Sequence, residues 1–119
     1  MAYIYHILDC NDWETAKKNN TYHPVSLENE GFIHCSRTDQ LQKVANSFYK
    51  GQTNLIIIRI EEDKVGPKVV HEPPLEAPMS GVLFPHIYGD LNIDSVDKEI
   101  EFPCNEDGTF QLPEELLGE

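Results

Sequence analysis

Hydrophobic residues recur along the chain with two different spacings, and these spacings predict where strands and helices lie. Short runs of β-branched and aromatic residues predict strands. Leu41, Val44, Ala45 and Phe48 instead fall at the i, i+3, i+4, i+7 spacing of one apolar helix stripe, which Gly51 ends. We therefore expect strands over residues 3–8, 31–36, 54–60, 69–72 and 99–102, with a further one within 83–96.

The fold class follows from the number and order of these elements. A helix is expected over residues 11–19 after a cluster of capping side chains, a second one begins near Thr38 or Asp39, and a single turn lies around 26–29. The run 55–58 is apolar on both faces, which is typical of a central strand that is covered on two sides. Helices are too few for regular alternation with strands, so the class is α+β with one mixed or antiparallel sheet.

The chain is long enough for one domain and too short for two. Its 119 residues are assigned to a single domain over 1–105 and an acidic tail over 106–119, which we expect to be solvated. Pro78, followed by Met79 and Ser80, predicts a loop over residues 75–81.

Composition and charge exclude several classes of partner. The chain has 21 acidic residues against 9 Lys and Arg, a formal net charge of -12, which disfavours binding to a nucleic-acid backbone. No apolar run is long enough to span a bilayer and the start lacks a secretion signal, so we expect a cytoplasmic protein without membrane contact. The sequence leaves the oligomeric state open.

Common catalytic motifs are absent, so histidines are the strongest candidates for chemistry. The sequence has no glycine-rich dinucleotide loop, no phosphate loop, no nucleophile elbow and no His-Glu-x-x-His. His6, His34, His71 and His86 lie on or beside predicted strands. His86 stands between Pro85 and Gly89, in an irregular backbone of the kind that bears functional sites.

Two alternative interpretations involve a reactive cysteine and a metal site. Cys35 and His34 are neighbours in a strand and point to opposite faces, so we expect Cys35 to be a buried and inert thiol. His6, His34, His86 and Glu72 are suitable metal ligands but lack the close spacing of a metal site. We expect no bound metal, and a metal-dependent hydrolase stays an alternative.

Several segments match the pattern of a known family in order and spacing. They include Ile4-Tyr5-His6-Ile7, Glu30-Gly31-Phe32-Ile33-His34-Cys35-Ser36 and Phe84-Pro85-His86-Ile87-Tyr88-Gly89. Over about residues 3 to 97 the chain resembles the DUF952 family of small uncharacterised proteins.

That family resembles the ADP-ribosyltransferase superfamily, including the RNA 2'-phosphotransferases. The resemblance implies a split, mostly antiparallel sheet with two main helices around an NAD-binding cleft. It aligns Tyr5 and His6 with a Tyr-His pair that anchors the adenosine ribose, and the segment 32–36 with a strand that holds the nicotinamide side. Ile7-Leu8 replaces the Gly-Thr that commonly follows the first histidine, and His86 lies in the region where a late catalytic Glu is usual.

The resemblance implies a small-molecule ligand, NAD or another compound with ADP-ribose or phosphate, and glycosyl or phosphate transfer as the activity. A non-catalytic binding module is the alternative. The candidate catalytic residues are His6, His34 and His86, and the candidate contacts to NAD are Tyr5, His6, Ser36, Tyr88 and Glu72. With no acid expected in the cleft except Glu72, a phosphate-bearing ligand should bind more tightly near pH 6 than near pH 8.

Overall fold

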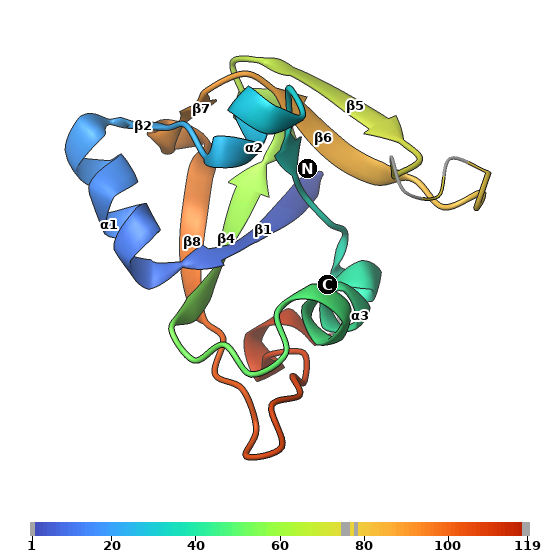
Figure 1. Ribbon diagram of the computed structural model, residues 1–119. Coiled ribbons are helices and arrows are strands. Elements are labelled where there is room, and N and C mark those ends of the chain that lie inside the picture. Colours follow the sequence, from blue (N-terminus) through green and yellow to red (C-terminus); the bar gives the residue numbers. More distant parts are fainter. Residues whose placement is uncertain (1, 75–76, 78, 118–119) are drawn as a thin grey trace.

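The computed structural model describes residues 2–74, 77 and 79–117, which form an α+β fold built on antiparallel strand pairs (Figure 1). The central sheet contains, in spatial order, β1 (Tyr3–Asp9), β4 (Leu55–Glu61) and β8 (Val96–Glu101). Both pairs are antiparallel, with His6 opposite Ile58 on one side of β4. The apolar run of β4 therefore lies in the middle of its sheet, as its pattern predicts.

A second sheet lies across one end of the first. Its order is β3 (Ile33–His34), β6 (Phe84–Tyr88) and β5 (Lys68–Glu72). An isolated bridge between Tyr5 and Ser36 joins β1 to the segment that follows β3. Two short strands, β2 (Thr21–Tyr22) and β7 (Leu91–Asn92), form a separate pair. The expectation of one sheet is therefore wrong, because only this single bridge connects the two larger sheets within the described part of the chain.

Helices lie on opposite sides of the central sheet. α1 (Cys10–Asn19) begins where the Asp9 side chain accepts a hydrogen bond from the Asn11 backbone, and ends at Asn20 with a left-handed φ of 57°. α2 (Val25–Asn29) is one short turn, and α3 (Thr38–Phe48) carries the predicted apolar stripe. Short 3₁₀ turns occur at Glu62–Lys64, Ile93–Ser95 and Glu114–Leu116. None of the described helices is long and apolar enough to cross a membrane.

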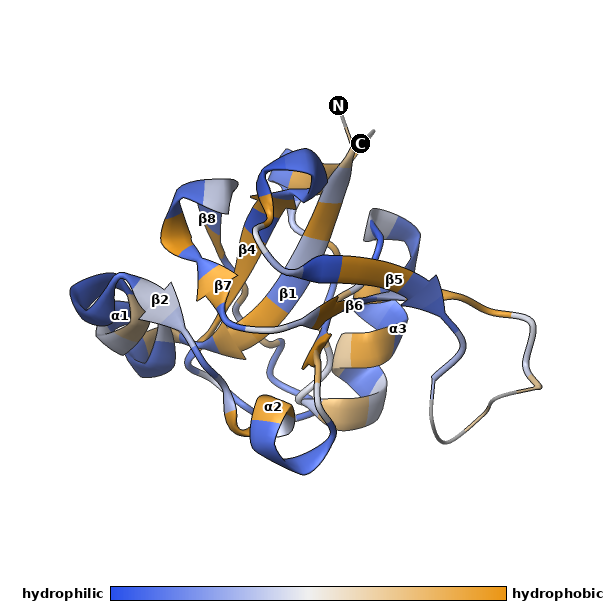
Figure 2. Cartoon of the chain, turned by 90° about the horizontal axis from the view of Figure 1, so that it is seen from above, coloured by the Kyte–Doolittle hydropathy of each residue, from blue (hydrophilic) through white to orange (hydrophobic). Residues whose placement is uncertain are grey.

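Alternate residues of the central strands point to opposite faces of the sheet and pack into two hydrophobic cores. Ile56, Ile58 and Ile60 of β4 pack toward Trp13 of α1, in a core that also contains Ile33 and Ile87. The other face packs against α3, and its residues include Ile7, Leu55, Ile57, Leu41, Ala45, Ile100 and Phe102. Hydrophobic residues are accordingly concentrated along β1 and β4 between the polar outer surfaces (Figure 2).

The segment that contains Phe110 and Leu116 is part of the second core. Phe110 and Leu116 are both 1% exposed, and the Phe110 backbone N–H donates to Asn46 of α3 over 2.7 Å. The acidic residues between them, Glu114 and Glu115, remain exposed. The expected solvated tail over 106–119 is therefore wrong for this segment, because its spaced apolar side chains cover the sheet. Of the predicted loop over 75–81, residues 75, 76 and 78 lie outside the described residues, as do 118 and 119 at the end of the chain.

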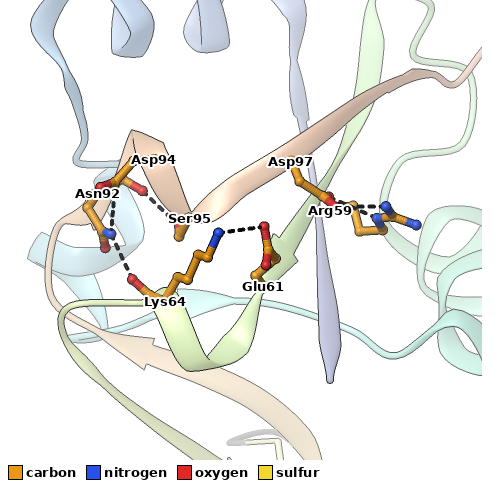
Figure 3. A network of polar contacts seen from close by, with 7 residues as sticks. All are labelled: Arg59, Glu61, Lys64, Asn92, Asp94, Ser95 and Asp97. Carbon is orange, nitrogen blue, oxygen red and sulfur yellow. Dashed lines mark hydrogen bonds and ion pairs between the residues drawn. The ribbon is translucent and has the colours of Figure 1, made fainter. Parts of the chain in front are cut away.

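A network of polar contacts links β4, the turn that follows it, and the segment from Asn92 to Asp97 (Figure 3). The Arg59 guanidinium of β4 donates to Asp97 of β8 over 2.9 and 2.8 Å, and this contact lowers the pKa of Asp97. The Asn92 amide donates to the Lys64 carbonyl over 2.9 Å, while Lys64 lies 3.3 Å from Glu61. These contacts tie the turn after β4 to β7 and β8.

Candidate functional site

A large cleft opens between α1, α2 and α3, and strands of both sheets supply its wall. Its volume is about 1090 Å³, at the upper end of the range for small-molecule sites. His6 comes from β1, His34 from β3, His86 from β6, and Ser36 from the segment joined to β1. The fold thus brings four of the residues singled out in the sequence to one cavity.

His6 is a buried neutral group whose two nitrogens are both occupied. Its Nδ1 donates to the His34 carbonyl oxygen over 2.5 Å, which fixes the proton on Nδ1. Nε2 then accepts a hydrogen bond from the Tyr22 hydroxyl over 2.8 Å. Burial lowers the pKa of His6 to about 4. His6 therefore links β1, β2 and β3 and is poorly suited to proton transfer.

His86 has one occupied nitrogen and one free nitrogen. Its Nδ1 donates to the Glu72 carboxylate over 2.8 Å, and its ring stacks on Phe32 with the centroids 4.0 Å apart. The Tyr88 hydroxyl donates to the same Glu72 oxygen. No described residue hydrogen-bonds Nε2 of His86. The His86 side chain is 2% exposed but lines the cleft, so a carboxylate orients its ring and Nε2 is the nitrogen left for a ligand.

The charges of the Glu72 cluster are set by its hydrogen bonds. Donation from Tyr88, and then from His86, lowers the pKa of the Glu72 carboxyl. The same contact raises the pKa of Tyr88 to about 12, because ionised Glu72 disfavours a second negative charge. Glu72 is thus a carboxylate at neutral pH and holds the Nδ1 proton of His86 in place.

His34 and Ser36 complete the cleft wall near His86. His34 is directly opposite His86 in the β3–β6 pair, with the ring centroids 5.6 Å apart, and its Nε2 donates to Glu30 over 3.0 Å. Ser36 is 6% exposed, and its hydroxyl makes no hydrogen bond within the described part of the chain. The Ser36 hydroxyl is therefore available to a ligand in the cleft.

Tyr5, Glu72 and Tyr88 are not part of the cleft wall, unlike the other predicted contacts. Tyr5 is 2% exposed and packs in the core beside α3, because adjacent residues of β1 face opposite ways and His6 takes the cleft side. Glu72 reaches the cleft only through His86, and Tyr88 is exposed outside it. A direct contact between Tyr5 and a ligand in this cleft does not fit the structure.

The cleft also contains residues that the sequence analysis missed. Asp9, Asp12 and Glu30 line it, so the expectation of a cleft without acids other than Glu72 is wrong. His23 lines it too, and hydrogen bonds to Asp90 and Glu28 raise the pKa of His23. Lys and Arg are absent from the wall as far as the described residues show. Tyr22 lies in the two-residue strand β2 and His23 directly follows it, and a strand this short shows no hydrophobic alternation in the sequence.

The two alternative interpretations of this region concern the Cys35 thiol and the possible metal ligands among the described residues. Cys35 is 3% exposed, and burial raises the pKa of its thiol, as expected of a structural cysteine. The described residues include no group of three or more His, Cys, Asp or Glu side chains that could hold a metal ion. The metal-dependent alternative therefore gains no support from this geometry.

Three solved structures of one protein are similar to the chain over nearly its whole length. The crystal structure of protein CC0527 from Caulobacter crescentus is 32% identical in sequence, covers 98% of this chain and 99% of that chain, and superposes with a TM-score of 0.82. A crystal structure of its double mutant gives 31% identity over the same shares and a TM-score of 0.84. Its solution NMR structure gives 32% identity, 94% of each chain and a TM-score of 0.75. No curated protein matches the chain.

The family comparison covers both sheets and most of the cleft. The model of the family described as protein of unknown function DUF952 matches residues 7–99, which include His34, Ser36 and His86. The chain therefore belongs to the DUF952 family.

Proposed function

We propose that the chain binds a small molecule with an ADP-ribose or phosphate group, with NAD as the first candidate, in the histidine-lined cleft. One observation carries the proposal: three histidines from three different strands line a single cavity of about 1090 Å³. A cavity of this size accommodates a dinucleotide-sized ligand. The resemblance to ADP-ribosyltransferases supplies the ligand class.

The geometry favours His86 over His6 and His34 as the group that acts on the ligand. Both nitrogens of His6 are occupied, whereas Nε2 of His86 has no partner among the described residues. Because Glu72 holds the proton on Nδ1, neutral His86 accepts a hydrogen bond at Nε2 and protonated His86 donates one. In a transferase that uses NAD, this nitrogen would accept the proton of the attacking hydroxyl, while the bond from ribose to nicotinamide breaks and nicotinamide leaves as a neutral molecule.

A non-catalytic binding module remains the second candidate function. The three carboxylates of the cleft wall favour it, because they oppose the build-up of negative charge that phosphate transfer requires. Release of nicotinamide from NAD separates the two functions. Turnover supports the transferase, and saturable binding without turnover supports the module.

Calorimetric titration with NAD and with ADP-ribose tests the proposal. We expect saturable binding to the native chain, and roughly 10- to 150-fold weaker binding to His86→Ala, since a hydrogen bond to a charged group contributes roughly 1.5–3 kcal/mol. His71→Ala is the matched control, because His71 lies on neighbouring β5 and pairs with Glu62 outside the cleft. Absence of binding to the native chain, or equal effects of the two substitutions, would contradict the proposal.

Glu72→Gln tests the orienting role of the carboxylate. The amide keeps the size of the side chain and removes its charge, so His86 should lose its fixed Nδ1 proton and part of its affinity for ligand. His86 tautomers observed by NMR give a readout that a merely structural role would leave unchanged.

A further inference from the structure

A second cavity adjoins the histidine cleft, between α3 and the segment that leads into β6. Its volume is about 670 Å³. The two cavities share four wall residues, Val44, Phe48, Pro74 and Phe84. Phe84 and His86 are two residues apart in β6 and so lie on the same face of the strand. A ligand that contacts His86 in the cleft is therefore beside the entrance to the second cavity.

The two cavities differ in charge. Asp9, Asp12 and Glu30 line the histidine cleft, where the described residues provide no Lys or Arg. Arg37 and Lys43 line the second cavity, with Asp39 as its one acid among the described residues. Along the combined groove the fixed charges thus change from acidic near α1 to basic along α3. An anionic group is repelled from the first end and attracted to the second.

The two cations of the second cavity are not equivalent. The Arg37 guanidinium donates to the Leu83 carbonyl oxygen over 2.8 Å and lies 3.4 Å from Asp39, so it holds the segment before β6. The Gln40 amide donates to the same carbonyl. Lys43 is exposed and forms no ion pair with any described residue. Lys43 is the cation that remains available to a ligand.

Taking the proposed function as its basis, we propose that the second cavity is the phosphate subsite of the cleft ligand. The ligand lies along the shared wall, with one portion at His86 and its anionic portion beyond Phe84, where the Lys43 ammonium binds a phosphate oxygen. Ser47 lines the same cavity one helical turn after Lys43 and offers a hydroxyl to the same group. This arrangement explains how so acidic a chain binds an anion, because the contact is local and distant charges are screened over about 8 Å at physiological salt.

Titration of Lys43→Gln with ADP-ribose and with adenosine, which lacks phosphate, tests this subsite. Lys43 is exposed, so its replacement should leave the fold intact. We expect ADP-ribose to bind about three- to tenfold more weakly, with the adenosine affinity unchanged. Lys18→Gln is the matched control, because it removes the same charge from an exposed position on α1 outside both cavities.

Four outcomes would overturn the subsite. ADP-ribose affinity unchanged in Lys43→Gln, or reduced equally in Lys18→Gln, would remove it while the proposed function stands if His86→Ala still weakens binding. An equal loss of adenosine affinity would assign Lys43 to another part of the ligand. Absence of ADP-ribose binding to the native chain would contradict the proposed function and the subsite together.

Discussion

His6 makes the stability of the protein depend on pH in a defined window. The folded protein holds His6 neutral with a pKa of about 4, whereas a histidine in the unfolded chain has a pKa near 6.5. Between these values protons bind preferentially to the unfolded state, so stability falls as the pH drops from 6.5 to 4 and is unaffected above 6.5. The pKa difference corresponds to about 3 kcal/mol of unfolding free energy.

Urea unfolding of the native chain and of His6→Gln at pH 7 and pH 4 measures this contribution. Gln does not titrate and retains an amide for hydrogen bonding, so the variant lacks the His6 term at both pH values. We expect the stability advantage of the native chain to shrink by about 3 kcal/mol between pH 7 and pH 4. An advantage that stays constant would show that His6 is not buried in neutral form.

Individual helices and strands differ in how well they can be predicted from the sequence. β4 and α3 were predicted correctly, because a short β-branched apolar run indicates a buried strand and the i, i+3, i+4, i+7 stripe indicates a helix. β2 and β7 have two residues each, too few for any periodicity, and they exist because distant segments pair. The C-terminal segment has isolated apolar residues whose contacts with α3 and β8 no local pattern reveals.

Adjacent leucines near the C-terminus test whether that segment is structural. Leu116 is 1% exposed and Leu117 is 64% exposed. Leu116→Ala should lower the free energy of unfolding by about 2–5 kcal/mol, as for other buried leucines, while Leu117→Ala should change it by less than about 0.5 kcal/mol. Equal effects of the two substitutions on the urea midpoint would instead support the prediction that this segment is a solvated tail.

At the scale of the whole molecule, the site is a product of the packing of two sheets. The sequence identified His34, Ser36 and His86 as candidates, but it could not show that the single bridge from Tyr5 to Ser36 brings β1 against β3. Nor could it show which acids face the cleft, because Asp9 and Asp12 are placed there by the orientation of α1. The charge of the cleft therefore depends on how the helices and sheets pack together, and it cannot be derived from the residue types in the sequence.

The cleft histidines should make ligand binding depend on pH. Histidine is the side chain that ordinarily gains a proton between pH 8 and pH 6, which makes the cleft less negative. We expect ADP-ribose to bind about two- to fivefold more tightly at pH 6 than at pH 8, and calorimetry in buffers of different ionisation enthalpy should detect proton uptake. Lys43→Gln should weaken binding similarly at both pH values. An affinity that does not change with pH would show that protonation of the cleft histidines does not contribute to ligand binding.

The most direct test of the proposed site is an NMR titration of the histidine side chains with ADP-ribose. Ring ¹⁵N signals report the protonation and tautomer of each histidine, and the native chain needs no substitution for this measurement. We predict that the Nε2 signal of His86 shifts in a saturable way, while His71 on the outer side of β5 keeps its signal. A His86 signal that stays unchanged at millimolar ligand, or a shift confined to His71, would contradict the account.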